Sequence, residues 1–318
     1  MNTFLKTLPA LVVLISSSTV YADFDSLFKQ QQNKALKDYH LAVAGDSKAT
    51  ASLKERANKG DRWAAFQYGY LAQTGQLLGL NGKPNINLAM RSYNLASKTV
   101  GDDGKLRNIY GNYLAAYNMG VIYYHGLYGV KADGATALRW FQAGALKSNN
   151  SNQVFWPAAV YAARIYSSGY GVRKDYREAF KYWKYAASKN EPVAVYEVGR
   201  AQFLGIGTDV NKQLGMSNLK RAAELWNIDA MYMLSMAHLH GNRFQEPNIS
   251  EAVKWLLIAG TKRPQYDQMA TQLMNQYRIP PNRRKMLFKA AGDWMNNHTR
   301  VPEAFDYRVP VNDDPAVR

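Results

Sequence analysis

The sequence is poor in groups that could catalyse a reaction. It has no cysteine and five histidines, which are His40, His125, His238, His240 and His298. His238 and His240 are close in sequence, but residues two apart on a helix diverge by about 200° and would not share a metal ion. We find no Gly-x-Ser-x-Gly, His-Glu-x-x-His or phosphate-loop motif. We therefore expect a protein that is not an enzyme, with no catalytic residue, metal ion or cofactor.

The first 22 residues have the layout of a secretory signal peptide. Lys6 supplies a positive charge, an apolar core runs from Leu8 to Ser18, and Val20-Tyr21-Ala22 is a small-x-small cleavage site. A buried helix or an uncleaved anchor is the alternative, but the apolar core is short for a bilayer. We expect a periplasmic or secreted protein that is cleaved near Ala22.

The charge balance is strongly basic, with a net charge of +16. Lys6 would leave with the signal peptide, so the mature chain would carry 39 basic and 24 acidic residues. An excess of this size favours acidic partners. Outside the cytosol we expect an acidic protein, with cell-wall polymer or anionic lipid as the alternative, and no nucleic acid.

A glycine that closes an apolar stretch recurs five times, at Gly75, Gly126, Gly169, Gly205 and Gly241. Eleven residues before each glycine is an alanine, nine before is a bulky residue, and six before is a small residue. In the fourth copy these are Ala194, Tyr196 and Gly199. The recurrence of all three offsets predicts one close-packed helix in each copy, which we call helix A.

A second landmark is an Asn or Asp after each glycine, at Asn85, Asp133, Asp175, Asn211 and Asn248. Such side chains accept hydrogen bonds from the free amides of a helix start. Small and bulky residues then recur on one helical face, which predicts a helix B in each copy. The spacing between caps is 48, 42, 36 and 37 residues. The first two copies therefore carry longer connections, with loops at Gly101-Asp102-Asp103-Gly104 and Asn149-Asn150-Ser151-Asn152.

The regions outside the repeats predict capping helices. We divide the chain into a signal peptide (1–22), an N-terminal capping helix (23–52), a repeat array (53–262), C-terminal capping helices (263–298) and an extended tail (299–318). The expected helices outside the five copies cover Asp25 to Val43, Leu53 to Lys59, Gln265 to Arg278, and Arg283 to Asn297. No segment alternates with period two, so we expect no strands.

The third and fourth copies carry the pattern most fully. Their residues are Tyr166-Ser167-Ser168-Gly169-Tyr170-Gly171-Val172, then Asp175, Ala179, Trp183 and Ala186-Ala187, with Gly205-Ile206-Gly207 repeating the turn. These residues resemble the Sel-1-like repeat family, a relative of the tetratricopeptide repeat. The first copy departs by a longer turn, and the fifth lacks the second turn glycine.

The resemblance implies an all-α fold. It would be a right-handed α/α superhelical solenoid of about five two-helix repeats with terminal capping helices. It also implies an interaction scaffold that binds a partner along a concave face. The paired cysteines of the relatives linked to β-lactam binding are absent from this chain. The expected function is thus a non-enzymatic periplasmic scaffold, such as a regulator or an immunity-type inhibitor. The alternative is an envelope-surface binder of peptidoglycan or anionic lipid through a basic face.

Candidate binding residues come from the position five residues before each closing glycine. This position holds Tyr70, Val121, Arg164, Arg200 and Met236. Stacked repeats would align Arg164 with Arg200, with Gln202 nearby, so that both arginines face an acidic partner. The alternative is that carboxylates such as Glu197 pair with them. Tyrosine suits interfaces, so the predicted partner-binding residues are Arg164, Arg200, Gln202, Tyr123 and Tyr70.

A second basic stretch lies around the third helix B. It comprises Arg173, Lys174, Arg177, Lys181, Lys184 and Lys189. Helix B should face outward, so a solvated surface is the simpler interpretation of this stretch.

Overall fold

The computed structural model describes residues 26–97, 99–100, 106–107, 112–145, 155–241 and 246–298. The expected signal peptide, the loops at 101–104 and 149–152, and the tail from residue 299 lie outside the described residues. The chain divides into two compact units. The first unit is Met1–Ile165 with Tyr170–Val172, and the second is Tyr166–Gly169 with Arg173–Arg318.

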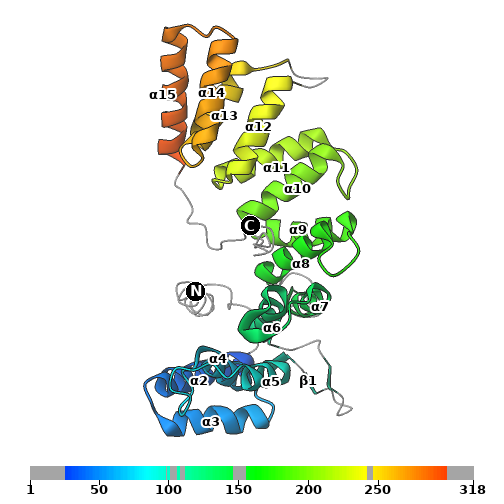
Figure 1. Cartoon of the computed structure of the whole chain (residues 1–318), viewed down its shortest axis with the longest axis vertical. Coiled ribbons are helices and arrows are strands. Elements are labelled where there is room, and N and C mark those ends of the chain that lie inside the picture. Colours follow the sequence, from blue (N-terminus) through cyan, green and yellow to red (C-terminus); the bar gives the residue numbers. More distant parts are fainter. Residues whose placement is uncertain are drawn as a thin grey trace. The chain divides into compact units, whose positions relative to one another are not determined.

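The first unit is built from helices that pack in sequence order (Figure 1). Helix α4 packs against α3 and α5, and α6 packs against α5 and α7. The alternation of A and B helices predicted for the first two copies is confirmed. The elements are α2 (Ser26–Val43), α3 (Ser47–Asn58), α4 (Arg62–Thr74), α5 (Ile86–Ser97), α6 (Tyr113–His125), the 3-10 turn η2 (Leu127–Gly129), α7 (Gly134–Ala145) and α8 (Trp156–Ser168), whose last residues fall in the second unit.

The second unit continues the same alternation. Helix α10 packs against α9 and α11, and α13 packs against α12, α14 and α15 (Figure 1). The two predicted closing helices are confirmed on either side of the Pro280-Pro281 break, and they begin at Pro264 and Pro281. The elements are α9 (Tyr176–Ala187), α10 (Pro192–Leu204), α11 (Lys212–Glu224), α12 (Ile228–His240), α13 (Ile249–Gly260), α14 (Pro264–Gln276) and α15 (Pro281–Asn297).

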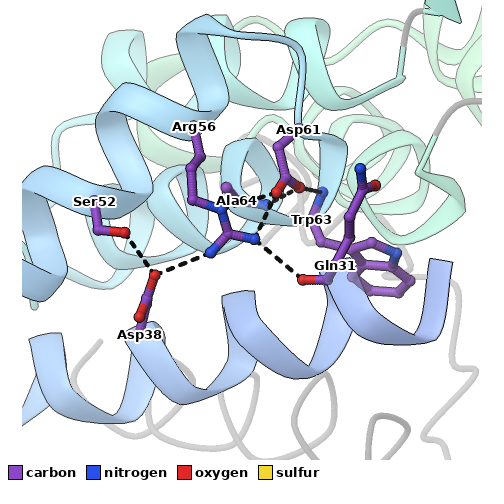
Figure 2. Close-up of polar contacts among 7 residues, drawn as sticks. All are labelled: Gln31, Asp38, Ser52, Arg56, Asp61, Trp63 and Ala64. Atoms are coloured by element: carbon purple, nitrogen blue, oxygen red, sulfur yellow. Dashed lines mark hydrogen bonds and ion pairs between the residues drawn. The ribbon is translucent and has the colours of Figure 1, made fainter. Parts of the chain in front are cut away.

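An arginine ties the first three helices of the first unit together (Figure 2). The Nη1 of Arg56 on α3 lies 2.9 Å from Asp38 Oδ2 on α2, and its Nη2 lies 2.5 Å from Asp61 Oδ2. The other carboxylate oxygen of Asp61 accepts two amide hydrogen bonds, each of 3.0 Å, from the first turn of α4. The side chain of Arg56 is 15% exposed, so these bonds form largely away from water.

All five predicted helix-B caps are confirmed. Each side chain accepts a hydrogen bond of 2.9–3.1 Å from an amide in the first turn of its helix B. The backbone amide of each cap donates in turn to a carbonyl near the end of helix A, at 2.7–3.0 Å. Each cap therefore starts helix B and closes the turn before it.

A second set of caps, at the start of helix A, was not predicted. Asp61, Asn112, Glu191 and Asn227 each accept a bond from the amide of the alanine three residues on. That alanine is the residue eleven positions before the closing glycine, so the repeat pattern already gave the position of the alanine whose amide each cap binds.

The expectation of no strands is wrong at one place in the described residues. Thr99–Val100 (β1) pairs antiparallel with Leu106–Arg107 (β2), within the first long connection. Each strand has only two residues, which is too short to show period-two alternation in the sequence. The Thr and Val of β1 favour an extended backbone. The all-α class is unaffected.

The second glycine of the Gly-x-Gly turn packs against the preceding helix B. Gly207 has φ 69°, in the left-handed region. A Cβ at Gly207 would collide with the carbonyl oxygen of Tyr176, the first residue of α9. In the first unit, Gly171 approaches the amide of Ala135 on α7 in the same way. Only glycine fits both the backbone angle and the space.

Candidate functional site

The five predicted partner-binding residues are divided between the two units. Tyr70, Tyr123 and Arg164 belong to the first unit, and Arg200 and Gln202 belong to the second. The alignment of Arg164 with Arg200 would join the units, so it stays a prediction.

Tyr70 lies in the core of the first unit. Its side chain is 4% exposed, and its ring centroid lies 6.0 Å from that of Tyr39 and 6.3 Å from that of Phe66. Burial, followed by the nearby tyrosines, raises the pKa of Tyr70 far above its usual value. Tyr70 therefore has almost no exposed surface that could contact a partner.

Arg164 and Tyr123 are both half-buried. Arg164 lies close enough to His125 to affect it. Burial, and then the charge of Arg164, lower the pKa of His125. The Nε2 of His125 lies 3.2 Å from the hydroxyl of Tyr161. Arg164 therefore belongs to a half-buried cluster that also contains the imidazole of His125.

Arg200 and Gln202 both have partners within the second unit. The Nε and Nη2 of Arg200 lie 3.0 and 2.7 Å from Glu197 Oε2. The Oε1 of Gln202 accepts a bond of 2.7 Å from Asn218 on α11. Arg200 is thus paired with a local carboxylate, which was the alternative interpretation of this arginine in the sequence. Its role in binding stays a prediction.

A wider set of polar and aromatic residues surrounds Arg200 on the A helices of the second unit. We call this set the A-helix surface, and it comprises Tyr196, Arg200, Asp229, Tyr232 and Arg263.

Contacts within the A-helix surface join neighbouring helices. The Nη1 of Arg263 lies 2.5 Å from Asp229 Oδ1, and these side chains remain 43% and 46% exposed. The ring of Tyr232 stacks on that of Tyr266 at 5.0 Å between centroids, with 20° between planes. Burial raises the pKa of Tyr196 to about 12, so its hydroxyl remains a neutral hydrogen-bond donor at pH 7. The surface thus offers rings, neutral hydroxyls and paired charges.

The packing of α10 explains why this surface is open. The buried residues of α10 are Ala194, Val195, Val198, Gly199 and Ala201. These small residues let α11 approach closely, since a Cβ at Gly199 would lie 2.9 Å from the amide nitrogen of Leu219. The rest of α10, including Tyr196 and Arg200, stays in contact with solvent.

Sequence reasoning missed four of the five members of the A-helix surface, which are Tyr196, Asp229, Tyr232 and Arg263. Tyr196 and Tyr232 occupy the bulky position nine residues before the closing glycine, which was used to locate helix A and not as a binding position. Arg263 follows the fifth copy, where the pattern stops. The residue type at this position gave no signal, because the second copy also has a tyrosine there, Tyr117, which is buried.

The possible metal ligands among the described residues are dispersed. Within the described ranges, no three His, Asp or Glu side chains are grouped so that they could hold a metal ion. His238 is 7% exposed whereas His240 is exposed, so the two side chains lie on different faces of α12. In the part of the chain that the structure describes, no helix is both long and apolar enough to cross a bilayer.

The fold and the paired small-residue helices define an all-α helical repeat protein. The family model for the Sel1 repeat matches five segments, at residues 64–98, 114–149, 156–191, 192–225 and 228–262. These segments make up more than half of the chain, and the protein therefore belongs to the Sel1 repeat family. Sel1 repeat proteins act as protein-interaction scaffolds and are generally non-catalytic.

Three relatives show where similar sequences occur. The chain is 29% identical over 147 residues to chitin synthase regulatory factor 3 of Schizosaccharomyces pombe, covering 45% of this chain and 16% of that protein. It is 34% identical over 113 residues to chitin synthase regulator SKT5 of Saccharomyces cerevisiae, covering 34% and 15%. It is 31% identical over 98 residues to the ERAD-associated E3 ubiquitin-protein ligase component HRD3B of Arabidopsis thaliana, covering 30% and 14%. The chain thus spans at most 16% of the length of these three relatives.

Two solved structures share the fold. One is c5321, a protective antigen of uropathogenic Escherichia coli, with a TM-score of 0.58 and 20% identity over 85% of this chain and 54% of that one. The other is a Sel1 repeat protein from Oxalobacter formigenes, with a TM-score of 0.55 and 19% identity over 72% of this chain and 84% of that one. At these identities the likeness establishes the fold alone.

Proposed function

We propose that this chain is an exported, non-catalytic scaffold that binds a protein partner on the A-helix surface of its second unit. The observation that carries the proposal is the row of half-exposed Tyr196, Arg200 and Tyr232 on the successive A helices α10 and α12, with the exposed Arg263 just before α14. Tyrosine and arginine, together with tryptophan, are enriched at binding hot spots. Their charges are already paired, with Glu197 and Asp229. The surface therefore recognises a partner chiefly by ring contacts and hydrogen bonds.

The role we propose is that of a regulator or an immunity-type inhibitor in the periplasm. The signal-peptide pattern of residues 1–22 supports the compartment. The names of the relatives support an accessory role, because two are called regulators of chitin synthase and one a component of a ubiquitin ligase. A protein that modulates another protein needs a shaped surface and no active site.

Copurification from a periplasmic extract tests the proposal. We expect a tagged wild-type chain to recover one stoichiometric protein, and the Tyr196→Ala, Tyr232→Ala double variant to lose it. Tyr277→Ala is the matched control, because Tyr277 is 46% exposed in the same unit but lies after α14. Equal recovery by the double variant and the wild type would refute the assigned surface. The absence of any stoichiometric protein would refute the scaffold role.

The basic stretch around α9 favours the second candidate function, an envelope-surface binder. This stretch carries six basic residues between Arg173 and Lys189, and they are exposed. Purified peptidoglycan and anionic vesicles distinguish the two candidates. Stoichiometric sedimentation of the chain with either material at 0.15 M salt would favour the second candidate, because weak surface attraction is screened at that ionic strength.

A further inference from the structure

The outer face of α9 carries three aligned cations. Arg177, Lys181 and Lys184 are spaced by four and three residues, so they lie on one face of the helix over about 10 Å. All three are exposed, and the opposite face is buried through Ala179, Trp183 and Ala186. We call these three cations the α9 stripe.

No other helix B in the described residues carries such a stripe. The stripe occupies the positions two, six and nine residues after the cap. Each of the other helices has a single basic residue among these positions. The equivalent residues are Asn87, Arg91 and Asn94 on α5, Ala135, Arg139 and Gln142 on α7, Gln213, Ser217 and Lys220 on α11, and Ser250, Lys254 and Leu257 on α13. The stripe is therefore a feature of this helix and not of the repeat.

The stripe is unfavourable for the helix that carries it. Like charges three and four residues apart repel each other, and a cation in the first turn opposes the helix dipole. Lys181 pairs with Glu178, and the Nζ of Lys184 lies 5.2 Å from the ring centroid of Phe180. Among the described residues, no carboxylate lies within ion-pair distance of Arg177 or Lys184. A local arrangement that opposes its own helix is characteristic of a functional surface.

An open hollow adjoins the first cation of the stripe. It has a volume of about 500 Å³ and is lined by Arg177, Gly205, Gly207, Thr208 and Asp209. The hollow exists because the Gly205–Gly207 turn packs against the start of α9, where Gly207 meets Tyr176. A side chain that reaches Arg177 would enter this hollow beside Thr208 and Asp209.

We propose that the α9 stripe is a second docking surface, which binds an acidic segment of a partner protein. Carboxylates at four- and three-residue spacing on a partner helix would meet the three cations in register. The partner is a protein segment rather than a membrane, because the exposed residues of α9 include Tyr176 and Tyr185 but no contiguous apolar face to insert, the apolar side of the helix being buried in the unit. The stripe lies on a helix B and needs no residue of the A-helix surface, so it goes beyond the function proposed above.

A designed peptide tests this surface directly. The probe is a fluorescein-labelled, alanine-rich helical peptide with glutamates at positions i, i+4 and i+7, titrated against the full chain at low ionic strength. A scrambled peptide of the same composition, with the glutamates on different faces, is its control. We expect Arg177→Gln, Lys181→Gln, Lys184→Gln to weaken binding of the in-register peptide about tenfold, since three exposed ion pairs each contribute modestly.

The matched control variant is Lys48→Gln, Lys54→Gln, Lys262→Gln, which removes the same charge from exposed residues elsewhere. We expect it to change the affinity less than twofold. The melting temperature of the stripe variant should not fall, because neutralisation removes repulsion from α9. The Tyr196→Ala, Tyr232→Ala variant should bind the peptide as the wild type does, which separates this surface from the A-helix surface.

Several results would overturn the proposal. The proposal is wrong if the wild type does not bind the in-register peptide, or if it binds the scrambled peptide equally well. It is also wrong if the control variant loses as much affinity for the in-register peptide as the stripe variant does. Vesicles that contain phosphatidylglycerol test whether the stripe binds a membrane instead. If they bind the wild type more tightly than the peptide does, and lose binding in the stripe variant, the surface is for lipid and the protein-segment proposal is wrong.

Discussion

The A helices of the two units differ in how many of their residues are buried. In α4 and α6, eleven of 13 residues are buried, whereas in α10 and α12 only five of 13 are buried. At the position nine residues before the closing glycine, Phe66 and Tyr117 are 3% and 5% exposed. Tyr196 and Tyr232 at the same position are half-exposed.

This difference shows that one repeat pattern can serve two purposes. In the first unit, α2 packs on α4 from outside the repeats and helps to cover it. In the second unit, the same positions face solvent and present tyrosine. The bulky residue is a core residue where the helix is covered and a half-exposed residue where it is open. The following predictions test this contrast, from the largest expected effect to the smallest.

The largest effect is expected from a buried tyrosine of the first unit. Tyr93 on α5 is fully buried, and its hydroxyl forms hydrogen bonds with Gln73 on α4 and Asn118 on α6, so it belongs to the packing that covers these two A helices. We expect Tyr93→Ala to lower the free energy of unfolding by about 3–5 kcal/mol, because it leaves a cavity and two unpaired amides. Tyr232→Ala in the second unit should cost about 1 kcal/mol, since it loses mainly one ring contact. Urea unfolding followed by circular dichroism measures both, and equal losses would contradict the contrast.

The two arginine ion pairs provide a second comparison. Arg56 is 15% exposed and contacts two carboxylates, whereas Arg200 is 32% exposed and contacts one. We expect Arg56→Gln to lower the free energy of unfolding by about 3 kcal/mol, because it leaves shielded carboxylates without a partner. Arg200→Gln should change it by less than about 0.5 kcal/mol. A larger loss for Arg200→Gln would mean that the arginine serves the fold rather than a partner.

A third prediction tests whether the second unit is loosely packed throughout or open only on its A helices. Gly207→Ala would collide with Tyr176, and we expect it to cost about 2 kcal/mol or more. The control is Gly129→Ala in the first unit, where φ is 79° but a Cβ would meet nothing within 4 Å. It should cost about 1 kcal/mol from backbone strain alone. Thermal melting of both variants gives the comparison, and equal shifts would indicate loose packing around Gly207.

The smallest effect is expected from pH, and both units should share it. Burial lowers the pKa of His125 in the first unit and of His238 in the second. As pH falls below about 6.5, the unfolded chain binds protons that the folded imidazoles do not. The free energy of unfolding should therefore decrease on acidification until the folded pKa values are reached. His125→Gln and His238→Gln should each flatten this dependence in urea titrations between pH 7.5 and 5, and an unchanged slope would show that the imidazole is accessible.

The local structure of the repeats could be predicted because it depends on short-range chemistry. Gly75, Gly126 and Gly205 end their helices in the left-handed region, at φ 74°, 65° and 76°. Each cap needs only a side-chain oxygen two or three residues before a free amide. Both signals are contained in a few consecutive residues, so spacing alone revealed them.

The candidate site could be predicted only in part, because burial depends on what packs from elsewhere in the chain. Tyr70 and Arg200 share one repeat position, yet Tyr70 is in the core and Arg200 is half-exposed. The ion pair between Arg263 and Asp229 joins residues 34 positions apart. No periodic pattern contains such a contact, since Arg263 lies beyond the fifth repeat.

The central claim, that the A-helix surface of the second unit binds a protein partner, is tested most directly by hydroxyl-radical footprinting. The chain would be labelled alone and in complex with the copurified protein, and the modification of each tyrosine measured by mass spectrometry. The account predicts that Tyr196 and Tyr232 lose reactivity in the complex, while Tyr277 keeps it. Unchanged reactivity of Tyr196 and Tyr232 in a complex that is otherwise formed would contradict the account.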